Sequence, residues 1–165
     1  MLDNLIDIEQ ALASASMPVI WLLIFVSIAF NYFGLACAGY WYFWVNPNSK
    51  AIRMHDRPIE SKQIQNEIFW STVSIALFAT LVLAMIQAWR FGFFPNLYFN
   101  PMERGWSVFI GNLVVFLLVQ DLLFYLTHRL LHTKHFQHFH RVHHSSVIPT
   151  PFAFYCFHPV EAIVH

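Results

Sequence analysis

Residues 121–165 read DLLFYLTHRLLHTKHFQHFHRVHHSSVIPTPFAFYCFHPVEAIVH and contain nine of the ten histidines in the chain. Five of them form two motifs, HxxxH (His128 and His132) and HxxHH (His140, His143 and His144). On an α-helix, either spacing places the imidazoles of one motif on a single face, about 6 Å apart along the axis for residues four positions apart. Imidazole is the commonest metal ligand in proteins, and five on two helical faces predict a site for iron, zinc or copper.

The connection between the two motifs must change direction if all five histidines serve one site. A straight helix through residues 128–144 would separate its ends by about 24 Å, which is too far for one mono- or binuclear centre. We therefore predict a bend or break between Thr133 and Phe139, although the sequence has no Gly or Pro there. His135 and His138 fall in this connector, off the faces of both motifs. They are predicted to be solvated or hydrogen-bonded in preference to binding metal.

Composition places the rest of the chain in a membrane. Of the 165 residues, 58% are hydrophobic, 18% aromatic and 11% charged, which is far from an average soluble domain. Apolar runs at about residues 17–45, at 68–88, and from 106 into the first histidine motif are each long enough to cross a hydrocarbon core of about 30 Å. We predict an all-α, polytopic membrane helical bundle. The formal net charge of zero, without a basic stripe, argues against a nucleic-acid partner.

The distribution of basic residues predicts the orientation in the membrane. The first loop, at 46–66, carries four basic residues, and the segment before the first apolar run carries none. The four are Lys50, Arg53, Arg57 and Lys62. By the positive-inside rule, the N-terminus lies outside and this loop lies in the cytoplasm. Two crossings later, the histidine motifs emerge on the cytoplasmic side of an integral multi-pass membrane protein.

Asp121 is an acidic residue inside the third apolar run, where a charge is costly and usually functional. With Tyr125, His128 and His132 it follows the spacing i, i+4, i+7 and i+11, close to one helical stripe. One interpretation is that its carboxylate orients the metal-binding histidines from one or two turns below, with Tyr125 nearby. The other is a polar contact with a different span. The stripe and the usual pairing of metal-bound histidine with carboxylates favour the first.

A further polar group surrounds Pro159. His158, Glu161 and His165 are spaced i, i+3 and i+7. Either they face the metal site, or Pro159 starts a helix on which His158 and Glu161 pair with neighbouring chain. The sequence leaves both interpretations open.

The absence of other ligand types narrows the chemistry. Carboxylate-bridged di-iron bundles use glutamates and Glu-x-x-His pairs, and no glutamate lies between Glu103 and Glu161. The HExxH motif of zinc hydrolases is absent as well. A histidine-dense site in a membrane therefore favours oxidative chemistry on an apolar substrate that is dissolved in the bilayer.

The order D-x3-Y-x2-HRxxH, FHRVHHSS and PTPFAFYCFHPVEA resembles the fatty acid hydroxylase/sterol desaturase superfamily, nearest to its sterol 5-desaturase (lathosterol oxidase) branch. The resemblance implies a membrane oxidoreductase of lipid biosynthesis that uses O2 to desaturate or hydroxylate a sterol at a non-haem di-iron centre. It implies electrons from a donor such as cytochrome b5 or a ferredoxin, and a location in the endoplasmic reticulum or a bacterial inner membrane. The implied ligands of the two iron ions, for which zinc is a substitute, are His128, His132, His140, His143 and His144.

Two alternatives stay open: the same chemistry on fatty-acyl or alkyl lipids, and a non-catalytic, truncated membrane fragment that binds metal. Superfamily members carry a third histidine motif, typically HxxHH, beyond the FHP motif, and this sequence does not reach it. The expectation is a transmembrane region at 1–105, followed at 106–165 by the N-terminal part of an incomplete catalytic domain. Five ligands under-coordinate two metal ions, so we expect the 165-residue chain itself to be inactive as an oxidase.

Overall fold

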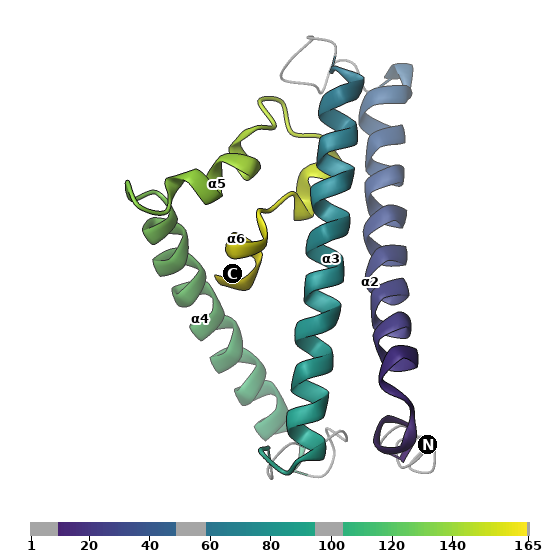
Figure 1. Cartoon of the computed structure of the whole chain (residues 1–165), viewed down its shortest axis with the longest axis vertical. Helices are drawn as coiled ribbons and strands as arrows, with labels where there is room; N and C mark the ends of the chain where they lie inside the picture. The colour runs from purple at the N-terminus through teal and green to yellow at the C-terminus, as the bar shows by residue number, and fades with distance from the viewer. Residues whose placement is uncertain (1–9, 49–58, 95–103, 165) are drawn as a thin grey trace.

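The three apolar runs form three long helices. The computed structural model describes residues 10–48, 59–94 and 104–164. The long helices are α2 (Met17–Tyr40), which continues into a π-helical turn η1 (Trp41–Val45), α3 (Ser61–Arg90) and α4 (Trp106–Leu131). Each is long and apolar enough to cross a membrane, and no strand occurs in the described ranges. The predicted all-α, multi-pass membrane bundle is confirmed (Figure 1).

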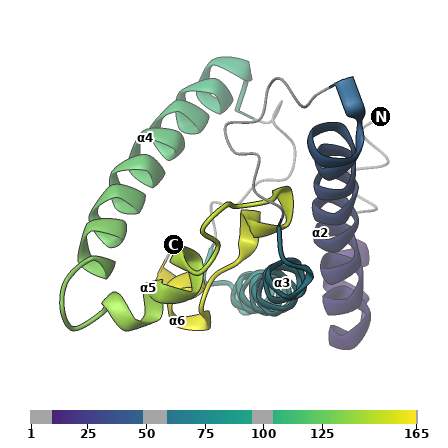
Figure 2. The ribbon, with the colours of Figure 1, turned by 90° about the horizontal axis from the view of Figure 1, so that it is seen from above.

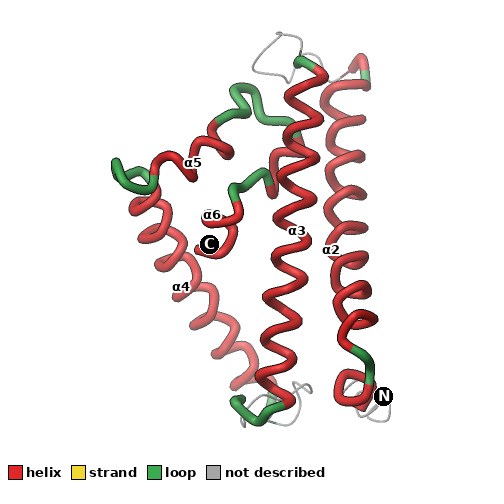
Figure 3. Tube along the Cα trace, viewed as in Figure 1, coloured by secondary structure: helices red, strands yellow, loops and turns green. Residues whose placement is uncertain are grey.

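Short helical elements follow α4 and turn back towards α3. They are α5 (Gln137–His144), the 3-10 helix η3 (Pro151–Tyr155) and α6 (Pro159–Val164). Coloured by secondary structure, the chain alternates between short helices and short loops after α4 (Figure 3). The C-terminal end of this region lies between α4 and α3 (Figure 1).

The helix α3 begins seven residues before the predicted start at residue 68. The stretch at its start was predicted to belong to the first loop, but half-buried Gln63 and buried Glu67 bond another part of the chain. Gln63 Nε2 donates to Glu67 Oε1 and to the backbone carbonyl of Ile148, both at 2.8 Å. The composition of this segment alone indicates a loop. The hydrogen bonds of Gln63 stabilise it as the first turns of α3. Of the basic residues used to predict orientation, Lys62 lies on α3, and Lys50, Arg53 and Arg57 lie outside the described residues.

The core lies where α2, α3 and η3 meet. The helices α2 and α3 run side by side, and η3 packs against both (Figures 1 and 2). Its buried cluster consists of Tyr32 and Ala36 from α2, Ile75 from α3 and Phe152 from η3. By contrast, α4 diverges from the other two long helices, and Leu131 is its one buried residue (Figure 2). Its exposed apolar side chains suit a helix that faces lipid.

Polar side chains of α2 and α3 hold the irregular backbone around η3. The carbonyl of Phe152 accepts hydrogen bonds from Tyr32 Oη at 2.6 Å and from Ser71 Oγ at 2.9 Å. Thr150 Oγ1 donates to Glu67, and Ser74 Oγ donates to the carbonyl of Phe157 at 3.4 Å. Backbone groups that are buried outside regular helices require hydrogen-bond partners within the protein. These side chains supply them.

The close approach of η3 to α2 depends on Gly39. A Cβ atom placed there would lie 3.2 Å from Pro151 Cγ. We expect Gly39→Val to lower the free energy of unfolding by about 1–3 kcal/mol, because the added methyl groups push η3 away from α2. Titration with sodium dodecyl sulfate in mixed micelles measures this change.

The matched control is Gly34→Val on the same helix, where a Cβ meets nothing within 4 Å. Because valine is a slightly better helix former than glycine, this control should change stability by only about 0.3 kcal/mol. Equal losses in the two variants would show that the contact with Pro151 is not what Gly39 permits.

Candidate metal centre

The two histidine motifs meet across a tight turn. The helix α4 ends at Leu131 and α5 starts at Gln137, so the predicted break between the motifs is confirmed. Thr133 organises the turn: its Oγ1 donates to the carbonyl of Leu130 at 2.7 Å, and its own carbonyl accepts from the backbone N–H of Gln137 at 2.9 Å. His132 caps the helix in a right-handed conformation. The turn therefore needs neither glycine nor proline.

Three imidazoles converge at this turn. One ring nitrogen from each of His128, His132 and His140 lies within 4.8 Å of the other two. His128 Nε2 and His132 Nε2 are 3.2 Å apart, and the ring of His140 lies 4.8 Å and 4.7 Å from their respective rings, measured between centroids. We call these residues the histidine trio. Three protein donors are typical of metal sites that keep a position open for water or substrate.

The other two predicted ligands border the trio. The ring centroid of His144 lies 4.4 Å from that of His140 and 5.4 Å from that of His132. The ring of His143 stacks on Phe157 at 5.3 Å. Its Nδ1 atom is buried and has no hydrogen-bond partner in the described ranges. All five histidines of the two motifs therefore lie in one cluster, of which three form the close group.

The surroundings of His140 favour the neutral imidazole that binds metal. Its side chain is 1% exposed. Burial, followed by the neighbouring imidazoles of which His144 counts most, lowers the pKa of His140 to about 4. Burial also lowers the pKa of His143. His140 Nε2 is buried and has no hydrogen-bond partner among the described residues. Since buried polar atoms are normally paired, an ion beside this nitrogen fits the site.

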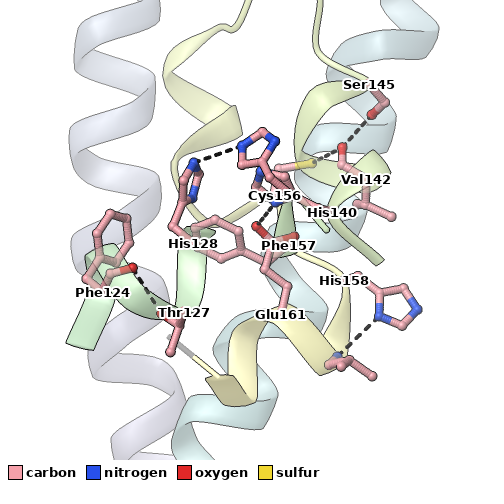
Figure 4. Close-up of polar contacts among 12 residues, drawn as sticks. Phe124, Thr127, His128, His140, Val142, Ser145, Cys156, Phe157, His158 and Glu161 are labelled. Carbon is pink, nitrogen blue, oxygen red and sulfur yellow. Dashed lines mark hydrogen bonds and ion pairs between the residues drawn. The ribbon is translucent and has the colours of Figure 1, made fainter. Parts of the chain in front are cut away.

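A carboxylate completes the environment of His140. Glu161 of α6 is fully buried, and its Oε1 lies 2.7 Å from His140 Nδ1. Figure 4 shows Glu161 reaching from α6 towards His140. Burial raises the pKa of Glu161 to about 7. When Glu161 is ionised and His140 is neutral, the carboxylate can only accept a hydrogen bond, so the imidazole donates its Nδ1–H. Of the two interpretations left open for Glu161, the structure shows the one in which it faces the site.

For His158, the structure shows the other interpretation, in which it bonds neighbouring chain at the start of a helix. Its Nδ1 accepts a hydrogen bond from the backbone N–H of Val160 at 3.2 Å, which satisfies a donor in the first turn of α6. Its ring lies 5.0 Å from that of Phe139 and 5.9 Å from that of Trp70. His165 lies outside the described residues.

The histidine motifs lie in a segment that is similar to a known protein family. Residues 113–165 match the fatty acid hydroxylase family. The chain is 30% identical over 131 residues to lathosterol oxidase of Rattus norvegicus, and 31% identical over 137 residues to a Delta(7)-sterol 5(6)-desaturase of Gibberella zeae. These alignments cover 78% and 82% of this chain. The chain belongs to the fatty acid hydroxylase/sterol desaturase superfamily.

The superfamily resemblance extends beyond sterol enzymes. A very-long-chain aldehyde decarbonylase of Oryza sativa is 37% identical over 59 residues, which are 35% of this chain and 22% of that protein. The chain spans 42% and 41% of the rat and Gibberella proteins, or about two fifths of their length. No solved structure matches the chain.

The other residues considered for the site in the sequence analysis are not members of the trio. Asp121 is exposed on α4, and no hydrogen bond or ion pair joins it to another described residue. Tyr125 Oη accepts from Arg129 Nη1 at 3.5 Å. His135 and His138 are exposed and are not members of the trio. The carboxylate that contacts a histidine is therefore Glu161, which no local pattern in the sequence links to His140.

Proposed function

We propose that this protein is a membrane oxidoreductase that uses O2 to desaturate or hydroxylate a sterol at a histidine-held iron centre. The observation that carries the proposal is the histidine trio, in which donors from two motifs come within 4.8 Å of one another. Its support is the identity of about 30% to lathosterol oxidases and sterol 5(6)-desaturases. Iron bound by the trio would supply the activation of O2 for attack on a C–H bond.

We assign one iron ion to the trio and a second to the side of the cluster formed by His143 and His144. The ring of His144 borders His140 and His132, and the ring of His143 lies 5.5 Å from that of His140 and 5.7 Å from that of His144. Zinc is an expected substitute because imidazole binds both metals. We also propose that residues 1–105 form a transmembrane region and that residues 106–165 form the N-terminal part of the catalytic domain.

Residues of the chain form an apolar route for the substrate to the trio and exclude water from one side of it. Phe124 stacks on His128 with ring centroids 5.8 Å apart, and the neighbouring side chains of α4 are apolar and exposed. A sterol dissolved in the bilayer can therefore approach the trio along α4. The burial of His140 excludes water from one side of the site. We place the trio on the cytoplasmic side, where cytochrome b5 or a ferredoxin would deliver electrons, in the endoplasmic reticulum or a bacterial inner membrane.

Lipid analysis tests the proposal. We compare extracts from cells that carry the intact gene, no gene, or the gene with His140→Ala. A sterol with an extra double bond or hydroxyl group should be present with the intact gene and absent from the other two. Loss of hydroxylated or desaturated acyl chains, with unchanged sterols, would support the fatty-acyl alternative. Unchanged lipids in cells whose protein binds metal would support a non-catalytic metal-binding fragment and contradict the proposed activity.

We further propose that Asp121 and Tyr125 act at the outer edge of the same centre, one to two turns below the trio on α4. Tyr125 is joined to the end of the helix through Arg129. Because Asp121 makes no contact with an imidazole among the described residues, we expect Asp121→Asn to weaken binding of Co2+ by less than about tenfold, the lower limit for a carboxylate bonded to a ligand. Titration of the metal-free protein with Co2+ measures this. A larger loss than that caused by removing a trio histidine would contradict the assignment.

A further inference from the structure

Glu161 and His140 form a buried side-chain pair between α6 and α5. Both side chains are at most 1% exposed, and the Oε1···Nδ1 distance is 2.7 Å. This distance is typical of a hydrogen bond in which one group is charged. The two residues are 21 positions apart in the sequence, so the fold creates the pair and helical periodicity does not.

The bond between Glu161 and His140 determines which ring nitrogen of His140 is available to bind metal. A neutral imidazole carries one N–H, and the partner of one nitrogen decides the state of the other. When Nδ1–H donates to Glu161, Nε2 retains its lone pair. This Nε2 atom is buried without a hydrogen-bond partner in the described part of the chain, and His140 is a member of the trio.

We propose that Glu161 is a positioning residue of the metal centre, whose carboxylate holds His140 with Nε2 directed at the ion shared with His128 and His132. The inference rests on the proposed metal site and adds a residue to it. Carboxylates bonded to metal-bound histidines fix the ring orientation and raise the basicity of the ligand. Glu161 supplies this contact from α6.

Ser74 of α3 and the contacts of His158 at the start of α6 hold Glu161 in place. Ser74 bonds the carbonyl of Phe157, immediately before α6. His158 caps the first turn of α6 through the N–H of Val160, and the carbonyl of His158 accepts from the N–H of Ala162 at 2.9 Å. The third member of the trio is thus connected through Glu161 to the membrane-spanning α3.

The first test compares two glutamate-to-glutamine variants of the whole chain. Glu161→Gln removes the charge beside His140. Glu67→Gln makes the same change in another fully buried carboxylate, which bonds Thr150 and Gln63 and no histidine. By Co2+ titration followed in the visible spectrum, Glu161→Gln should weaken binding by about 10–100-fold. The control should stay within about threefold, since it alters no bond to an imidazole.

The outcomes separate this inference from the proposed function. A wild-type chain that binds no Co2+ would overturn the metal centre, and this inference with it. Wild-type binding with unchanged affinity in Glu161→Gln would overturn the inference alone. Equal losses in Glu161→Gln and Glu67→Gln would also overturn it, because the effect would then come from the fold.

A second readout takes its deciding result from the wild-type protein. Nitrogen NMR of the metal-free wild-type protein, with 15N-labelled histidine at pH 8, reports which ring nitrogen carries the proton. The signals of His140 are identified by their loss in His140→Gln. The expected form has the proton on Nδ1 and a bare Nε2, and Glu161→Gln should redistribute it between the two nitrogens. A wild-type His140 protonated on Nε2 would overturn the proposal.

Discussion

Replacing His140 with alanine should remove the metal ion that we assign to the trio. We expect elemental analysis to show the loss of about one ion per chain, the ion that we assign to the trio. His140 is the buried member of the trio and its one donor from α5. The remaining pair, His128 and His132, would hold an ion with two imidazoles from one helix. We expect affinity to fall by about 100-fold or more, equivalent to about 2.7 kcal/mol.

Two further variants test whether this loss of metal is specific to the trio. His138→Ala removes an exposed imidazole from the same helix, outside the trio, and should retain the ion. The double variant His143→Ala, His144→Ala should also retain the ion of the trio. If the wild type holds about two ions and this double variant about one, the second ion belongs to His143 and His144, as proposed from the cluster around the trio. Full metal content in His140→Ala would contradict the assignment of the trio.

The second large effect is expected from the two hydroxyl groups that share the carbonyl of Phe152. Tyr32→Phe or Ser71→Ala alone should cost about 1 kcal/mol, because the carbonyl keeps one donor. The double variant leaves a buried carbonyl without either donor. It should cost about 3 kcal/mol, more than the sum of the single changes. Unfolding by sodium dodecyl sulfate in mixed micelles measures all three variants.

A hydroxyl on the same helix provides the control for this cycle. Thr72 Oγ1 bonds the carbonyl of Ile68 within α3 at 2.8 Å and does not reach η3. Thr72→Val keeps the shape of the side chain and removes the hydroxyl, and should cost less than about 0.5 kcal/mol. Strictly additive losses in the Tyr32 and Ser71 variants would falsify the shared role of this carbonyl.

Sequence patterns predicted those parts of the fold that depend on neighbours along the chain. Apolar length predicted the three spanning helices, with α4 beginning at Trp106 as expected. The spacing of the histidines, combined with the geometry of one metal site, predicted the turn that follows α4. In each case the deciding interactions lie within a few residues, or within one helix and the lipid around it.

The parts that could not be predicted depend on contacts distant in sequence. The helix α3 starts early because Gln63 bonds Ile148, 85 positions away. The search for a carboxylate partner of the histidines led to Asp121, since helical periodicity relates only residues of one helix. Glu161 contacts His140 from a different helix, and no periodic pattern joins them.

The position of the trio along the chain has a consequence for biosynthesis. Its three donors lie between residues 128 and 140, on either side of one turn, so all of them leave the ribosome before η3 and α6 do. The bonds that fix this region to α3 close loops of more than 80 residues and form after that point. If the trio binds metal as proposed, it can do so before that point, and the docking of η3 and the arrival of Glu161 would then secure an ion that is already in place.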